Sequence, residues 1–132
     1  MILLDSSAWV EYLRDAGSPV GSRVREAVKS KEALATSDVI LMEILAGARD
    51  DSHRDRLRRM LYSCSMLSVE GPTDYEQAAE LYRSCRRGGE TPRKMSDCLI
   101  AAVAIRNDVP VLHADADFLA IARHAALRLV VV

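Results

Sequence analysis

The sequence has few aromatic side chains, almost no net charge and no long apolar run. Only 5% of its 132 residues are aromatic, so a single domain of this length needs a core of Leu, Ile, Val and Ala. The 18 basic and 19 acidic residues leave a formal net charge of -1, which excludes nucleic-acid binding driven by overall charge and requires a local site instead. Because no apolar run approaches the ~20 residues of a bilayer span, we expect a cytoplasmic protein without membrane association.

Cysteine is scarce, and no pattern connects the three that occur. Cys64, Cys85 and Cys98 are odd in number and show no CxxC or other zinc-type spacing, which excludes a disulfide framework and a thiolate metal site. We expect buried, reduced thiols. The apolar start, Met1–Leu4, meets Asp5 at once and has no basic leader, which is not the pattern of a secretory signal.

Short apolar segments alternate with helical patterns along the whole chain. Helical spacing or capping residues predict helices over 8–14, 20–30, 38–46, 50–62, 73–87, 97–106 and 117–124. Thr73 and Glu76 resemble a capping box at the start of the fifth of these helices, whose first turn also holds Asp74. Strands are expected at 1–4, 34–36, 66–69, 110–113 and 127–132. This alternation predicts one α/β domain spanning residues 1–132, with helices on both faces of a mostly parallel sheet of about four to five short strands.

Three acidic residues follow the ends of predicted strands. Asp5 comes directly after the first strand, and Asp115 and Asp117 follow the strand at 110–113. In open α/β sheets, ligand sites form outside the carboxyl ends of the strands, so we expect these side chains to face one another. The alternative for each is an ordinary turn or capping residue.

Two further acids lie within apolar helices. Glu43 interrupts the run Val39–Leu45, and Asp97 precedes the uncharged stretch Cys98–Ile105. A carboxylate in such surroundings is costly unless it is paired, hydrated or bound to a cation. Asp97 is open to a second explanation as a residue that stabilises a helix N-terminus, and Glu43 to one as a surface residue.

A shared pocket of these carboxylates predicts a divalent metal site. Carboxylates held close together require counter-charge, and no Lys or Arg stands directly beside Asp5, Glu43 or Asp97 in the sequence. Oxygen ligands without His or Cys suit Mg²⁺ or Mn²⁺, ions that promote hydrolysis of phosphodiesters.

Basic residues flank the glycine-containing loop that precedes Asp97. Arg86, Arg87, Arg93 and Lys94 are candidates for holding RNA phosphates beside a metal site. The alternative is a solvated helix end whose basic side chains complement the helix C-terminus.

Four segments together resemble the sequence motifs of PIN-domain ribonuclease toxins of the VapC type. These segments are Asp5–Trp9, Ser37–Gly47, Ser96–Ala102 and His113–Phe118. Their order and spacing fit that family over the whole chain. The resemblance implies a three-layer α/β/α fold and a Mg²⁺- or Mn²⁺-dependent endoribonuclease that acts as the toxin of a type II toxin–antitoxin pair.

The resemblance also implies roles for individual residues and partners. Asp5, Glu43, Asp97 and Asp115 match the catalytic acids, with Asp117 as a candidate fifth metal ligand and Ser7 as a hydroxyl that supports Asp5. Asp5 and Asp97 would be the direct ligands, while Glu43 and Asp115 would bind a second ion or orient water. The expected partners are an RNA substrate, a second copy of the chain and a VapB-type antitoxin with a basic C-terminal segment.

Two other functions stay open at this point. One is a magnesium-dependent phosphohydrolase with Asp5 as the nucleophile, although such enzymes carry a second Asp where this chain has Ser7. The other is a non-catalytic interaction protein in which the acids hold a structural ion or dock a basic partner.

Overall fold

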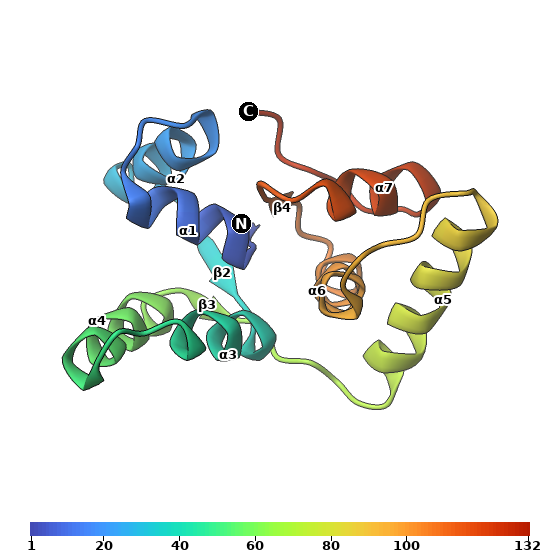
Figure 1. Ribbon diagram of the computed structural model, residues 1–132, viewed down its shortest axis with the longest axis horizontal. Helices are drawn as coiled ribbons and strands as arrows, with labels where there is room; N and C mark the ends of the chain where they lie inside the picture. Colours follow the sequence, from blue (N-terminus) through green and yellow to red (C-terminus); the bar gives the residue numbers. More distant parts are fainter.

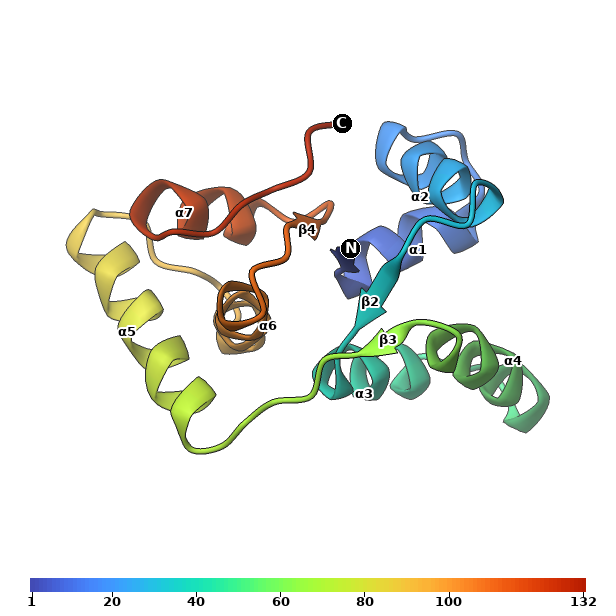
Figure 2. The same cartoon turned by 180° about the vertical axis from the view of Figure 1, so that it is seen from behind.

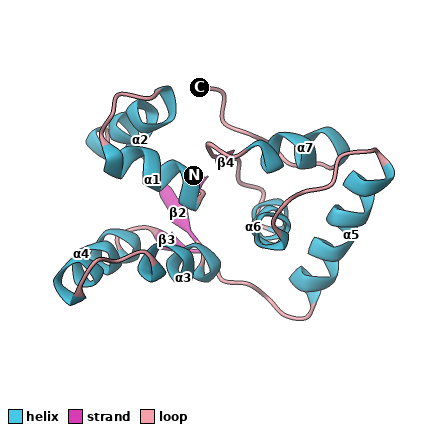
Figure 3. Ribbon diagram, viewed as in Figure 1, coloured by secondary structure: helices cyan, strands magenta, loops and turns pink.

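The computed structural model describes residues 1–132 and contains seven helices and four short strands (Figures 1 and 3). In chain order the elements are β1 (Ile2–Leu4), α1 (Ser6–Arg14), α2 (Pro19–Lys29), β2 (Leu34–Thr36), α3 (Asp38–Ala46), α4 (Asp51–Tyr62), β3 (Ser65–Met66), α5 (Thr73–Arg87), α6 (Met95–Arg106), β4 (Val111–Leu112) and α7 (Ala116–His124). All seven predicted helices are present, with ends that differ by a few residues at most.

The four strands form one parallel sheet in the order β3-β2-β1-β4. Ile2 pairs with Leu34 and Leu3 with Ala35 on one side of β1, while Leu4 pairs with Leu112 on the other. The strands have only two or three residues each, and their apolar side chains are largely buried, as expected for a parallel sheet covered on both faces.

Helices cover the sheet on both sides, which confirms the α/β/α layers. In Figure 1 the pairs α1–α2 and α3–α4 occupy the left half, above and below β2, and α5, α6 and α7 occupy the right half; Figure 2 shows the same division from behind. The topology explains this division. The chain moves outward from β1 to β3 through the first four helices, then returns through α5 and α6 to β4 at the opposite edge, and right-handed crossovers in opposite directions lie on opposite faces.

The core is aliphatic, as the composition predicts. Leu3, Leu4, Ile40 and Ile100 are fully buried, and Trp9 and Phe118 are the two aromatic side chains among the largest buried ones. The helix α6 runs through the middle of the molecule, where residues 97–98 and 100–104 are buried. Since this helix is surrounded by protein, its N-terminus delivers Asp97 into the interior.

The predicted strand at residues 127–132 does not form. Leu129 makes a single isolated parallel bridge to Val111, and the chain end is exposed, with Val131 93% accessible. Two backbone hydrogen bonds join this segment to β4, from the Val111 N–H to the Arg128 carbonyl at 3.0 Å and from the Val130 N–H to the Val111 carbonyl at 2.9 Å, so the pairing is confined to one residue of β4.

The predicted capping box at α5 is also wrong. Pro72 precedes the helix, and no side chain caps it. Instead Asp74 is 1% exposed, accepts a hydrogen bond from the Glu70 peptide N–H at 2.8 Å and pairs with Arg106 of α6 at 2.8 Å. The capping box does not form because Thr73 is itself the first residue of the helix and Pro72 stands in the capping position.

The cysteines carry no disulfide. Cys85 and Cys98 are buried, as expected, whereas Cys64 is only half-buried. None of the helices has both the length and the apolar character that a membrane crossing requires.

Candidate metal centre

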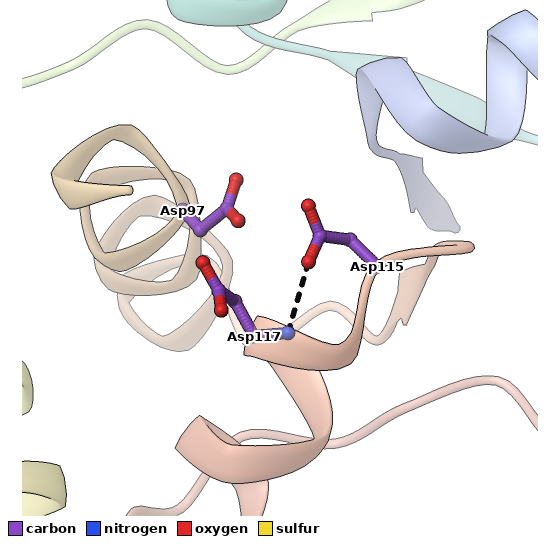
Figure 4. Close-up of side chains that lie close together, drawn as sticks. All are labelled: Asp97, Asp115 and Asp117. Carbon is purple, nitrogen blue, oxygen red and sulfur yellow. Dashed lines mark hydrogen bonds between the residues drawn. The ribbon is translucent and has the colours of Figure 1, made fainter. Parts of the chain in front are cut away.

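Three carboxylates meet at the edge of the sheet where β4 ends (Figure 4). Asp97 comes from the first turn of α6, Asp115 is the residue that caps the start of α7, and Asp117 comes from the first turn of α7. One oxygen from each lies within 4.8 Å of the others, and all three side chains are buried. The structure therefore brings together three of the five predicted acids as a close group.

Asp5 lies beside this group because β1 and β4 are neighbours. Its peptide N–H donates to the carbonyl of Leu112 at 3.0 Å. Its Oδ2 accepts hydrogen bonds from the Ser7 peptide N–H at 3.0 Å and from the Ser7 hydroxyl at 2.5 Å, and that hydroxyl accepts one from the Ala114 peptide N–H at 2.9 Å. The other oxygen, Oδ1, is buried without a hydrogen-bond partner. Ser7 thus links the end of β1 to the turn that carries Asp115.

Asp115 is both a helix cap and a member of the group. Its Oδ1 accepts from the peptide N–H of Asp117 at 2.9 Å, and its Oδ2 lies 2.9 Å from Nζ of Lys94. Burial would raise the pKa of Asp115, but the Asp117 N–H and the cations of Lys94 and Arg93 outweigh it and lower the pKa to about 2. The capping interpretation is confirmed, and it uses Oδ1, which leaves Oδ2 to face the lysine side chain.

Asp97 has the most unfavourable surroundings of the set. The side chain is 1% exposed, and its Oδ2 accepts no hydrogen bond. Burial and the nearby charges of Asp5 and Asp115 raise the pKa of Asp97 to about 8, with Lys94 offsetting part of the effect. In the absence of a cation this carboxyl is mostly protonated at neutral pH.

Two basic side chains of the preceding loop point into the group. Nζ of Lys94 lies 3.8 Å from Oδ2 of Asp97, and Nη2 of Arg93 lies 3.2 Å from Oδ1 of Asp115. The counter-charge that the acids require therefore comes from residues that are not directly adjacent to them in the sequence. Lys94 stands one helical turn before Asp97, a separation that places two side chains on the same face of a helix.

Asp117 differs from the other acids because its oxygens accept hydrogen bonds from the peptide groups of the loop before α6. Oδ2 accepts from the peptide N–H groups of Arg93 and Lys94 at 3.0 and 3.1 Å, and Oδ1 lies 3.6 Å from Nε of Arg93. The carboxylate therefore positions the segment that supplies the two cations.

Glu43 is half-buried at the margin of the site, not within the close group. Its Oε1 accepts from the hydroxyl of Ser6 at 2.8 Å, and its Oε2 lies 3.5 Å from the hydroxyl of Ser96. These serines directly follow Asp5 and precede Asp97, so they connect α3 to the starts of α1 and α6. Sequence reasoning missed both serines, although each adjoins a predicted acid in its motif.

Arg86 and Arg87 do not reach the carboxylates. Both are exposed at the end of α5, where Arg86 lies over the ring of Tyr82 and Arg87 donates to the hydroxyl of Ser84. Of the four predicted basic residues, only Arg93 and Lys94 meet the acids.

The chemistry of the site fits a hard divalent cation. All its ligand atoms are oxygens, and two of them, Asp5 Oδ1 and Asp97 Oδ2, are buried without hydrogen-bond partners. A buried oxygen without a partner is costly, and a bound cation would satisfy it.

Comparisons with known proteins agree with this fold. The family model of the PIN domain matches residues 2–124. The chain is 47% identical over 129 residues to "Ribonuclease VapC11" of Mycobacterium tuberculosis, covering 97% of this chain and 96% of that protein.

Solved structures resemble the fold at low sequence identity. VapBC2 from Rickettsia felis, bound to a promoter DNA fragment, matches with a TM-score of 0.73 and 18% identity, covering 98% of each chain. FitAcB from Neisseria gonorrhoeae matches with a TM-score of 0.71 and 21% identity, covering 98% of this chain and 96% of that one. The Mycobacterium tuberculosis toxin VapC20, described as cleaving the sarcin–ricin loop, matches with a TM-score of 0.68 and 19% identity, covering 97% and 99%.

Proposed function

Because this chain belongs to the PIN-domain family, and within it to the VapC ribonucleases, we propose that it is the toxin of a toxin–antitoxin pair and hydrolyses RNA phosphodiester bonds with Mg²⁺ or Mn²⁺ held by its carboxylates. The observation that carries the metal dependence is the pair of buried oxygens without partners, Asp5 Oδ1 and Asp97 Oδ2. They belong to different elements at the same edge of the sheet, where a cation would offset their repulsion.

The residues that would hold the ion are Asp5, Asp97 and Asp115, with Glu43 at the edge for a second ion or for orienting water. The ion would neutralise the phosphate and activate water. Asp115 suits the role of fourth acid better than Asp117, because its Oδ2 contacts only a movable lysine side chain, whereas Oδ2 of Asp117 accepts two peptide N–H bonds. Ser7 would keep Asp5 oriented through its short hydrogen bond.

Lys94 and Arg93 are the residues we assign to the RNA phosphate next to the ion. Their peptide groups are fixed by Asp117, while their side chains are exposed enough to turn from the carboxylates to a substrate. Once bound, a divalent ion would supply the positive charge that these two side chains give to the carboxylates in its absence. An RNA role for Arg86 and Arg87 stays a prediction with no support from the contacts of the site.

Two protein partners follow from the family. The solved structures that resemble this fold include a toxin–antitoxin complex, which supports an antitoxin of the VapB type as a partner. We propose that a basic C-terminal segment of this antitoxin enters the acidic site. Pairing of two copies is supported by a groove where Met42 and Tyr75 are exposed beside Leu99. A toxin that acts on cellular RNA would work in the cytoplasm.

The two alternatives find no such support. A covalent phosphohydrolase would need an acid where Ser7 stands. Here the Ser7 hydroxyl donates a hydrogen bond to Asp5 instead. A purely structural ion or a docked basic partner would not account for the family relationship to ribonucleases.

The test is RNA cleavage by the purified chain after metal removal. We expect no cleavage in EDTA, and cleavage restored by Mg²⁺ or Mn²⁺. Undiminished cleavage in excess EDTA would contradict the metal mechanism, and no cleavage of total cellular RNA under any metal condition would contradict the ribonuclease assignment. Phosphate transfer to Asp5 from a small phosphoester would favour the phosphohydrolase.

A further inference from the structure

A groove of about 310 Å³ runs from the carboxylate site along the outer face of α1. Its volume lies at the lower end of the range for small-molecule sites. Ser6 and Lys94 line the end next to the carboxylates, and Val10, Glu11 and Arg14 line the rest. The groove is continuous with the site, because Ser6 donates to Glu43 and Lys94 contacts Asp115.

The spacing of these residues along α1 places three of them in one row. Ser6, Val10 and Arg14 are each four residues apart, so they share one face of the helix. At 1.5 Å per residue, Arg14 lies about 12 Å along the helix from Ser6. A cation at that distance from the carboxylates is too far to neutralise them and is free to serve something else in the groove.

The charges and exposure of the groove suit a polyanion with apolar parts. The side chain of Arg14 is 69% exposed, and its only ion pair is a 3.5 Å contact with Glu11. Lys94 is 50% exposed at the other end. Between them Val10 presents an apolar surface to solvent, so an apolar patch separates two cations.

We propose that this groove is the binding track for the RNA strand beside the cleaved bond, with Arg14 holding a phosphate away from the metal and Val10 contacting the intervening ribose or base. This assignment rests on the proposed ribonuclease function and adds a subsite to it. Single-stranded RNA fits the pattern because it alternates phosphates with flat, weakly polar bases, and sequence-tolerant binding of such strands combines cations with contacts to the bases. Glu11 opposes this binding and limits its strength.

The experiment compares Arg14→Gln with Arg83→Gln, using a short fluorescent single-stranded RNA of mixed sequence that the parent protein cleaves. Arg83 is a matched control, because it also pairs with a Glu three residues earlier on a helix, Glu80, but lies on α5 outside the groove. We expect Arg14→Gln to raise KM about five-fold with little change in kcat, and to reduce the slope of log KM against log salt by about 0.7. Arg83→Gln should leave both quantities unchanged.

A second variant should change KM in the opposite direction. Glu11→Gln removes a negative charge from the groove and releases Arg14 from its ion pair, so KM should fall below that of the parent protein. A merely structural role of this pair would raise KM or lower the melting temperature in both variants. Binding of the same RNA with Ca²⁺ in place of the catalytic ion should change in the same directions.

The outcomes separate this inference from the proposed function. If the parent protein cleaves the RNA but Arg14→Gln behaves like Arg83→Gln, the track is refuted and the ribonuclease assignment stands. If Arg14→Gln leaves KM unchanged but weakens the complex with a co-expressed antitoxin, the groove belongs to the partner and the track is again refuted. If the parent protein cleaves no RNA with Mn²⁺, the ribonuclease function itself fails.

Discussion

Replacement of Asp97 by Asn separates a metal ligand from an ordinary helix-start residue. The change keeps the size and shape of the side chain and removes its charge. If Asp97 only stabilised the start of α6, Asn would serve almost as well and RNA cleavage would persist. If it holds the ion, cleavage should fall by orders of magnitude while the fold survives.

The structure sets the size of the effect on stability. Burial and neighbouring carboxylates raise the pKa of Asp97 from an ordinary 3.8 to about 8, and each pKa unit corresponds to about 1.4 kcal/mol. At pH 7 the metal-free protein therefore loses up to about 4 kcal/mol relative to acidic solution, because the unfolded chain ionises this group and the folded chain does not. The variant has no such penalty and should melt up to about 12 °C higher without metal.

The sign of the pH dependence follows from the direction of the pKa shift. A carboxyl whose folded pKa is raised contributes stability that is present below pH 4 and is lost as the pH rises towards 8. Asp115, with its pKa lowered to about 2, acts in the opposite sense and in a lower window, since its contribution is lost as the pH falls from about 4 to 2. Between pH 5 and 8 His113 also contributes, because burial lowers its pKa and its contribution is lost as the pH falls. The contribution of Asp97 is therefore the difference between the parent protein and Asp97→Asn at each pH.

The assay is thermal melting of metal-free and Mn²⁺-loaded protein between pH 5 and 8, together with RNA cleavage. Mn²⁺ should raise the melting temperature of the parent protein strongly and that of the variant weakly. Asp51→Asn is the matched control, because Asp51 stands in the first turn of α4 with its side chain 93% exposed. Asp74 does not serve as a control, since it is buried against Arg106.

Two results would refute this reasoning about Asp97. One is an Asp97→Asn protein that cleaves RNA at close to the parental rate. The other is a metal-free parent protein whose melting temperature stays constant from pH 5 to 8 and matches that of the variant. The expected combination is loss of cleavage together with a cooperative melting transition that, without metal, lies at a higher temperature than that of the parent protein.

Three further changes test other contacts of the structure. Lys94→Met should lower the stability of the metal-free protein, because the lysine ammonium offsets the charges of Asp115 and Asp97. Since the ammonium competes with the metal ion for these carboxylates, the variant should bind Mn²⁺ several-fold more tightly in calorimetric titration, and weaker binding would contradict this. Ser7→Ala leaves the Ala114 N–H without its acceptor and should lower the free energy of unfolding by about 1–3 kcal/mol in denaturant. It should also lower kcat with little change in KM, and a change in KM with kcat unaltered would argue against a role in orienting Asp5. Arg106→Met leaves the buried carboxylate of Asp74 without its cation and should destabilise the fold by about 3–5 kcal/mol, while kcat at low temperature stays unchanged. A melting temperature equal to that of the parent would show that this ion pair does not stabilise the protein.

The helices and the layer architecture are determined by local sequence properties. Apolar periodicity and breaker residues mark each helix, and the alternation with short apolar strands leaves few topologies other than a parallel sheet between two helical layers. The acids at the ends of β1 and β4 follow from the same logic, since parallel strands bring their carboxyl ends to one edge. Residues 127–132 are apolar enough for a strand, but their pairing with β4 is confined to Val111, and such an interruption of pairing is not visible in the local sequence.

The partners of individual acids, in contrast, depended on contacts between distant residues. The sequence does not reveal that Asp74 pairs with Arg106, because 32 positions separate them and only the packing of α5 against α6 brings them together. The same holds for the bonds from Asp117 to the peptide groups of Arg93 and Lys94, 24 and 23 positions away. These bonds turn the loop inward and place two cations among the carboxylates, which no local pattern predicts.

The sequence by itself determined which acids are present and at which end of the sheet they gather, because that follows from local periodicity and strand direction. The tertiary structure alone decided how each acid is used. Asp115 and Asp5 each give one oxygen to a helix start and keep the other for the site, Asp117 holds the loop, and Asp97 is left buried with an oxygen that nothing satisfies. The physical reason is that burial and long-range hydrogen bonds, which set the charge of a carboxyl group, arise only once distant segments are packed together.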